Sequence, residues 1–177
     1  SLVDAEAFSK ILEEAGGSSS LNASTSAEET RYVVSLPSNQ IELWCWMERE
    51  RFHEPVLREF YKERDAVMEE RRMRVESSPF GKLIEELLAK AFTTHPYRRP
   101  VIGYEADLNN FSRTDAQAFY AKHYGVRRFT TAIVGDVDPI TLVPLLERYF
   151  SDLAAGPEPT EVDVTEPKQD AERRVDV

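Results

Sequence analysis

Two glutamates in this sequence, Glu63 and Glu70, have a residue type and a spacing that could serve chemistry. They stand seven positions apart in a run of strong helix formers, residues 60–72. At 3.6 residues per turn, seven positions return to nearly the same direction, so both carboxylates leave one face of a helix with Val67 between them. A solvated helix gains little from this arrangement, yet most charge runs are solvated faces. The residues alone leave both interpretations open.

Composition limits the class of protein. The chain has 177 residues, of which 41% are hydrophobic, enough for one ordinary domain with a real core. Its formal charge of -10 argues against binding to nucleic-acid phosphates or to anionic lipid. No stretch approaches the roughly 20 apolar residues that span a bilayer. A neutral or cationic polypeptide is therefore the expected partner, and the cellular location stays open.

The single cysteine, Cys45, lies between Trp44 and Trp46. It has no partner for an internal disulfide, and its neighbours are apolar. We therefore expect it to be a small buried hydrophobic residue and not a nucleophile.

The first third of the chain predicts a helix, a hairpin and a second helix. Apolar residues recur at helical intervals over residues 8–15, after Asp4 as a cap and before Gly16 and Gly17 as a stop. Residues 21–25 and 30–36 alternate between apolar and polar, which predicts an antiparallel hairpin. Residues 39–51 predict a helix that is apolar on nearly all sides and hence buried.

The middle of the chain predicts three more helices. The first starts at Pro55, carries Glu63 and Glu70, and ends near residue 77, on the order of 30 Å long. A second covers residues 80–92, and the proline-containing stretch 93–100 is a loop. Ser112 and Asp115 have capping-box spacing before a third helix that Gly125 ends.

The last part predicts a strand, a helix and a linker. Residues 129–134 are rich in β-branched side chains and predict a buried strand. Asp138 caps a helix to about residue 150, in which Pro144 should cause a kink. Residues 154–177 form an acidic, proline-containing linker that ends in a strand-like alternation from residue 173.

Four segments in a fixed order carry a resemblance to a known family. They are residues 16–25 with 30–32, residues 63–70, residues 119–124 and residues 134–138. Together they cover about residues 5–152. In this order the chain resembles the pitrilysin and insulinase family of zinc metallopeptidases, with bacterial members and the mitochondrial processing peptidase most similar.

The resemblance implies roles for the two glutamates. The family holds zinc with an inverted His-x-x-Glu-His helix and a distant glutamate, the second of a pair spaced by seven. Glu70 would then be the third zinc ligand, and Glu63 a carboxylate that orients the histidine ligands. Glu69 points about 100° away from Glu70 and is expected to be a surface charge. Zinc also needs three protein ligands and one open position for water.

The histidine motif is the point at which the sequence departs from the family. His53, His95 and His123 stand in no His-x-x-Glu-His arrangement, and we expect them to be ordinary surface or half-buried residues. Either the sequence begins after the helix that carries the motif, or it comes from an inactive homologue. In both cases we expect no bound zinc on this chain, which alone would not hydrolyse peptides. In the first case we expect Zn²⁺ in the intact enzyme.

The resemblance also assigns a role to the first strand of the hairpin. In the family the corresponding strand is an exposed edge that pairs with extended substrate through backbone hydrogen bonds. This implies a substrate-binding strand that consists of Leu21, Asn22, Ala23, Ser24 and Thr25. An interior strand with a close approach at Ala23 is the alternative.

These observations lead to one expected architecture. We expect an α+β fold, a mixed or antiparallel sheet with helices packed on it, as an incomplete metallopeptidase lobe over residues 1–153. Residues 154–177 would lead to a strand of a second lobe. Missing strands should leave an edge open for a homodimer, a partner subunit or the second lobe.

Three functional hypotheses follow. The first is a fragment of a zinc endopeptidase that cleaves extended peptides. The second is a non-catalytic homologue that binds peptides or an active partner. The third is a structural module, which gains weight if the glutamates pair with arginines, namely Arg64, Arg71 or Arg74.

Overall fold

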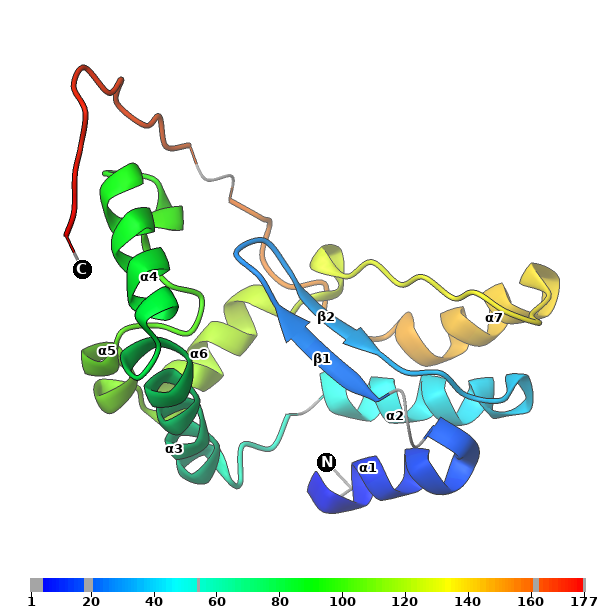
Figure 1. Cartoon of the computed structure of the whole chain (residues 1–177). Helices are drawn as coiled ribbons and strands as arrows, with labels where there is room; N and C mark the ends of the chain where they lie inside the picture. Colours follow the sequence, from blue (N-terminus) through cyan, green and yellow to red (C-terminus); the bar gives the residue numbers. More distant parts are fainter. Residues whose placement is uncertain (1–4, 18–20, 54, 161–162, 177) are drawn as a thin grey trace. The chain divides into compact units, whose positions relative to one another are not determined.

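The fold is α+β, with helices and a small antiparallel sheet (Figure 1). The computed structural model describes residues 5–17, 21–53, 55–160 and 163–176. Contacts divide the chain into two units. The first unit is Ser1–Val56 with Gln117–Pro159, and the second is Leu57–Ala116 with Thr160–Val177. No helix in the described ranges has the length and apolar character that a bilayer crossing requires.

The first unit begins with the predicted helix, α1 (Ala5–Leu12), followed by a π-helical turn (Glu13–Gly17). Gly16 has φ 101°, a left-handed conformation that residues with a Cβ adopt at a cost, and it ends the helix as expected. The predicted cap, Asp4, lies outside the described residues.

The hairpin is confirmed as antiparallel. Strand β1 (Asn22–Thr25) pairs with β2 (Thr30–Val33), and Ala23 stands opposite Tyr32. The turn is closed by the Ser26 N–H, which donates to the Glu29 carbonyl oxygen at 2.9 Å. In the same turn the Ser26 hydroxyl accepts hydrogen bonds from two backbone N–H groups, which is the local preference of serine at such positions.

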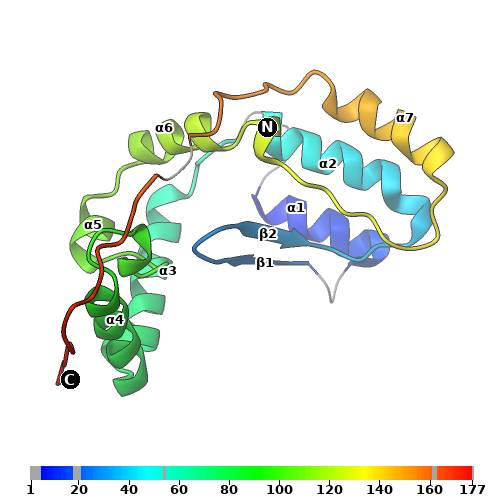
Figure 2. The same ribbon diagram turned by 90° about the horizontal axis from the view of Figure 1, so that it is seen from above.

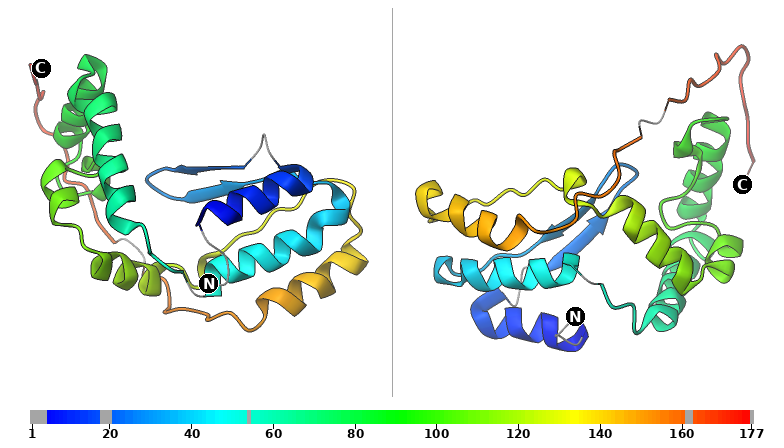
Figure 3. Two further views of the ribbon diagram at one scale, coloured as in Figure 1. Left: turned by 90° about the horizontal axis from the view of Figure 1, so that it is seen from below. Right: turned by 180° about the vertical axis from the view of Figure 1, so that it is seen from behind.

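Two helices, α2 (Ile41–His53) and α7 (Pro139–Phe150), run beside each other in the first unit (Figures 2 and 3). Asp138 caps α7 as predicted, because its carboxylate accepts a hydrogen bond from the N–H of Ile140. The fully buried side chains of this unit include Leu12, Met47 and Cys45.

The burial of Cys45 confirms the prediction that it is a small hydrophobic residue. Desolvation is the main cause that raises the pKa of its thiol to about 11, so the thiol is protonated at neutral pH.

Helices dominate the second unit. Its long helix α3 (Phe60–Arg71) continues through a π-helical turn (Arg72–Glu76), and α4 (Pro79–Ala91) follows with Ser78 as its cap. The prediction that the long helix starts at Pro55 is wrong, because residues 55–57 have no regular structure and residues 58–59 form a turn before the helix begins at Phe60.

Two shorter elements complete the helical part. The sequence did not predict α5 (Glu105–Asn110), since six mostly polar residues have no usable periodicity. The predicted helix after residue 112 is α6 (Arg113–His123), whose residues are divided between the units. Its capping box is confirmed, because Ser112 and Asp115 each accept a hydrogen bond from the other's backbone N–H.

The prediction of a buried strand over residues 129–134 is wrong. These residues follow a 3-10 turn (Val126–Arg128) and pair with no strand in the described part of the chain, and Val134 is 96% exposed. Residues 173–176 form no strand either. A β-branched sequence becomes a strand only where a neighbouring strand satisfies its backbone groups.

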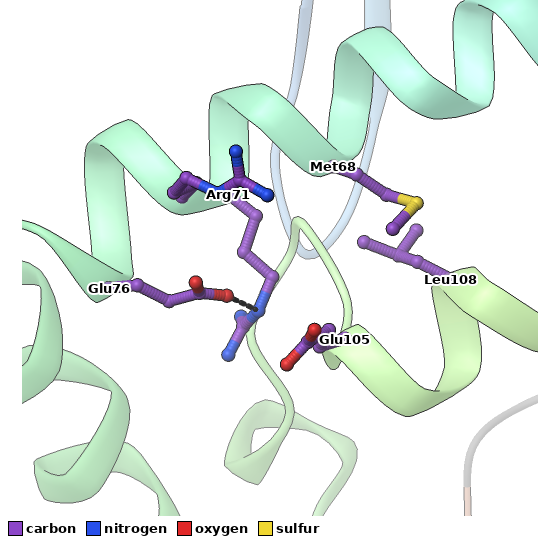
Figure 4. Close-up of a pocket in the computed structure, with 6 residues that line it drawn as sticks. Met68, Arg71, Glu76, Glu105 and Leu108 are labelled. Atoms are coloured by element: carbon purple, nitrogen blue, oxygen red, sulfur yellow. Dashed lines mark ion pairs between the residues drawn. The ribbon is translucent and has the colours of Figure 1, made fainter.

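A buried arginine organises the second unit. Arg71 is 6% exposed, and its guanidinium donates to both carboxylate oxygens of Glu85 at 2.8 and 3.0 Å and to the Gly103 carbonyl oxygen at 2.8 Å. The Nε of Arg71 lies 3.5 Å from a carboxylate oxygen of Glu76 (Figure 4). The hydrogen bonds with Glu85 are the main cause that raises the pKa of Arg71 above its ordinary value against the effect of burial. The negative charges of Glu85, Glu76 and Glu105 raise it further. The cluster thereby joins α3, α4 and the loop at Gly103.

This cluster yields a stability prediction. Arg71→Met should lower the free energy of unfolding by about 3 kcal/mol, because it leaves the carboxylate of Glu85 partly buried without its partner. The matched control is Arg72→Met on the same helix, whose exposed pair with Glu69 should contribute less than about 1 kcal/mol. Urea denaturation with linear extrapolation measures both. Equal losses in the two variants would contradict the organising role of Arg71.

Candidate functional site

Both candidate glutamates are on α3, in the second unit. Glu63 is exposed, and no ion pair of its carboxylate is found within the described ranges. Glu70 is half-buried, with a side chain that is 40% exposed, and its carboxylate lies 2.9 Å from the guanidinium of Arg74. The uninterrupted helix between them places the two carboxylates on one face, as the spacing predicts.

A second pair with the same spacing fixes the rotation of this helix. Arg64 and Arg71 each follow one of the glutamates and are turned inward. Arg64 donates to the carbonyl oxygens of Asn109 and Phe111 at 3.3 and 3.4 Å, and Arg71 makes the buried contacts described above. Because consecutive residues differ by about 100°, the inward arginines hold the glutamates at the border with solvent.

The contact between Glu70 and Arg74 bears on the structural-module hypothesis. It is an ion pair of the kind that this hypothesis requires, but the Arg74 side chain is 75% exposed. Exposed pairs of this i, i+4 kind contribute about 0.3–0.5 kcal/mol. Arg74 therefore holds the carboxylate only weakly, and Glu70 can exchange this partner for a stronger one.

The described residues do not by themselves fit a zinc site. No group of three or more His, Cys, Asp or Glu side chains that could hold a metal ion occurs among them. Zinc needs three protein ligands, and α3 offers at most one from its acidic face. Glu69 pairs with Arg72 at 2.9 Å on the exposed side of the helix, where the sequence places a surface charge.

The histidines have ordinary surroundings. His53 is exposed at the end of α2. His95 is half-buried, and its Nδ1 accepts a hydrogen bond from the N–H of Tyr97 at 3.3 Å. The His123 ring packs on Phe119 with centroids 4.4 Å apart, and partial burial is the main cause that lowers its pKa.

A cavity of about 20 Å³ lies beside α3, lined by Arg71, Glu76, Glu105 and three other residues (Figure 4). This volume accommodates about one water molecule. It is a packing gap around the buried arginine and is too small for a peptide side chain.

The predicted substrate-binding strand, residues 21–25, lies in the first unit and contains β1. All four residues of β1 are exposed, and within the described part of the chain β1 pairs with β2 alone. Leu21 precedes β1 and is half-buried. The N–H of Ala23 donates to the side-chain oxygen of Asn22 at 2.8 Å. The other edge of β1 is unpaired within the described residues, and the role of residues 21–25 as a substrate-binding strand stays a prediction.

Sequence reasoning missed the aromatic cluster that supports the hairpin. The Tyr32 hydroxyl on β2 lies 3.2 Å from that of Tyr124, and the Arg51 guanidinium lies 3.9 Å from the centre of the Tyr32 ring. Tyr120 stacks on Tyr124 and donates from its hydroxyl to the Phe52 carbonyl oxygen at 3.0 Å. The i, i+4 spacing of Tyr120 and Tyr124 was the available signal.

Burial changes the acidity of these tyrosines. Desolvation is the main cause that raises the pKa of Tyr120 to about 12, and it also raises the pKa of Tyr32, with the Tyr124 hydrogen bond second. The tyrosines are therefore neutral below pH 10, and in this form their hydroxyl groups make the hydrogen bonds that hold β2.

Comparison with known proteins identifies the family. Residues 3–105 match the insulinase family, peptidase family M16, and residues 110–177 match the peptidase M16 inactive domain. The chain belongs to this family, as the resemblance implied, and its fold is that of an M16 protease lobe.

The relatives of this chain include proteins named as zinc proteases. The chain is 33% identical over 171 residues to the zinc protease PqqE of Helicobacter pylori. The aligned region covers 94% of this chain and 38% of that protein. A crystal structure of a protease from Helicobacter pylori matches with a TM-score of 0.88 and 31% identity, over 96% of this chain and 41% of that one. The first half of the periplasmic protease PqqL from Escherichia coli has the same fold, with a TM-score of 0.72, 22% identity and coverage of 91% and 35%. The chain thus spans about two fifths of the length of these three relatives.

The tyrosines predict a loss of stability in alkali. The folded-state pKa values of Tyr32 and Tyr120 lie above the ordinary value of about 10. Their contribution to the free energy of unfolding is therefore complete below pH 10 and is lost as the pH rises toward 12. Thermal unfolding at pH 8, 10 and 11 should show that the difference in Tm between the parent and Tyr120→Phe narrows as the pH rises. A constant difference would contradict the assignment.

Zinc content tests the conclusion about metal ligands. The purified 177-residue chain, equilibrated with zinc and desalted, should retain much less than one zinc ion per chain, because it lacks a complete ligand set. Elemental analysis measures this ratio. A stoichiometric ratio would show that the ligand assignment is wrong.

Proposed function

We propose that this sequence is part of a zinc-dependent endopeptidase that acts on extended peptides. In this proposal Glu70 is one zinc ligand, and Glu63 orients the histidine ligands. Two histidines and the general-base glutamate come from a His-x-x-Glu-His helix outside these 177 residues. Membership of the M16 family and the zinc-protease names of its relatives support the proposal.

The observation that carries the proposal is the position of Glu70 on α3. A glutamate that holds helices together makes strong buried contacts, as Glu85 does with Arg71. Glu70 instead stands at the solvent border in a weak pair with Arg74, on the same face as Glu63. A ligand that awaits partners from elsewhere would have this environment.

The substrate in this proposal binds to residues 21–25 by strand addition. An exposed edge offers backbone donors and acceptors that pair with any extended peptide, which gives affinity with little demand on sequence. The aromatic cluster around Tyr32 and Arg51 would keep the hairpin rigid while a peptide is added.

The partner in this proposal is a second lobe or a partner subunit. Residues 1–153 would form most of one lobe, and residues 154–177 the linker to the other. The match to the first half of a longer periplasmic protease supports a two-part protein. The unpaired edge of β1 would also suit a homodimer, which stays a prediction.

A non-catalytic homologue is the second candidate. It is favoured by the match of residues 110–177 to the domain described as inactive and by the absence of His-x-x-Glu-His in these 177 residues. The gene upstream of the codon for Ser1 discriminates between the two candidates. A His-x-x-Glu-His sequence there supports the peptidase, and any other sequence supports the non-catalytic subunit.

The roles of the glutamates predict distinct effects in the full-length protein. Glu70→Gln should abolish zinc-dependent peptide hydrolysis, because it removes the charged ligand. Glu63→Gln should weaken zinc retention about 10- to 100-fold, which is typical when a group that orients a ligand is changed. Zinc affinity by competition with a chelator and hydrolysis of an unstructured peptide measure these effects.

Glu69→Gln is the matched control, because it makes the same change on the adjacent position of α3. This variant should keep both zinc and activity. Activity that survives Glu70→Gln, or is lost equally in Glu69→Gln, would show that the assignment of Glu70 is wrong.

A further inference from the structure

The extended segment 163–176 of the second unit is anchored by one carboxylate. Glu166 accepts five hydrogen bonds of 2.5 to 3.0 Å from the loop that follows α4. Three come from the consecutive backbone N–H groups of Thr93, Thr94 and His95, and two come from the threonine hydroxyls. Consecutive N–H groups that converge in this way form an anion-binding concavity. Its ligand is a residue more than 70 positions away in the sequence.

A second anchor uses the opposite charge. The guanidinium of Arg173 donates to the carbonyl oxygens of Lys90 and Ala91 at 2.6 and 3.3 Å. These carbonyls belong to the last turn of α4, where helix ends have unpaired acceptors and a partial negative charge. The segment lies near α4 in Figures 1 and 2. Glu166 thus binds the donors that follow the helix, and Arg173 binds the acceptors that end it.

The hydrogen-bond donors around Glu166 favour its ionised form. The Thr93 hydroxyl, then the N–H groups of His95, Thr93 and Thr94, lower the pKa of Glu166 well below its ordinary range, against partial desolvation. Arg98 lies on the same loop and donates to the Thr93 carbonyl oxygen at 2.8 Å. The other titratable side chains of this loop are those of His95, Tyr97 and Arg99. The stabilisation that Glu166 supplies is present above its unfolded-state pKa of about 4.3 and is lost only as the pH falls below it.

We propose that Thr93, Thr94 and His95 form a carboxylate-binding site whose resident ligand is Glu166, and that this site with Arg173 holds residues 163–176 as a strap on the second unit. The strap stays closed at neutral pH. If the proposed two-lobe peptidase is correct, the strap shortens the free part of the linker to the second lobe, and so limits how far the lobes can separate. The strap itself depends only on contacts within the second unit.

Hydrogen exchange of the intact protein that contains this sequence tests the strap. Glu166→Ala should speed exchange of the amides of Thr93, Thr94 and His95 by at least about tenfold at neutral pH, because charge-assisted hydrogen bonds are lost. Glu172→Ala is the matched control, since Glu172 lies on the same segment and pairs with the neighbouring Arg174. It should leave these amides unchanged.

The arginines offer a second matched pair. Arg173→Met should make the segment 163–176 more sensitive to limited proteolysis, whereas Arg174→Met should not. Unchanged exchange in Glu166→Ala, or equal changes in Glu172→Ala, would overturn the proposal. Zinc content measured on the same samples separates this result from the proposed function, because a failed zinc assignment would leave the protection of these amides in place.

Discussion

The burial of Arg71 is the constraint on which the arrangement of the second unit depends. A guanidinium removed from water needs partners in fixed directions, and Glu85 with the Gly103 carbonyl oxygen supplies them. Helix α3 therefore has one permitted rotation about its axis, which Arg64 reinforces two turns earlier. The acidic face that contains Glu63 and Glu70 is a consequence of this rotation. Arg64 and Arg71 make the inward contacts, and the two glutamates remain at the border with solvent.

Local patterns of sequence predicted much of this structure. Caps and helical periodicity located α4, α6 and α7, and alternation located the hairpin, because each signal acts within a few residues. The strand expected at residues 129–134 fails for the opposite reason, since a strand depends on a partner that local sequence does not specify. The contacts of Arg71 with Glu85 and of Glu166 with Thr93 join distant residues, and no periodicity in the sequence predicts such contacts.

The candidate site could be predicted only in part. The spacing of Glu63 and Glu70 predicted a shared face, and alternation predicted the strand β1, which is exposed. The support beneath the hairpin, in which Arg51 and Tyr124 hold Tyr32, depends on packing and was not visible in the sequence. The chain spans about two fifths of the length of the two Helicobacter pylori proteins that it matches, and its described residues offer no complete ligand set.

The central claim is that Glu70 completes a zinc site built mostly by residues outside this sequence. Anomalous diffraction at the zinc edge from crystals of the intact protein tests it most directly. The account predicts one zinc ion bound by a carboxylate oxygen of Glu70 and two imidazole nitrogens, with Arg74 displaced from the carboxylate. A zinc ion held without Glu70, while the Glu70 pair with Arg74 remains intact, would contradict the account.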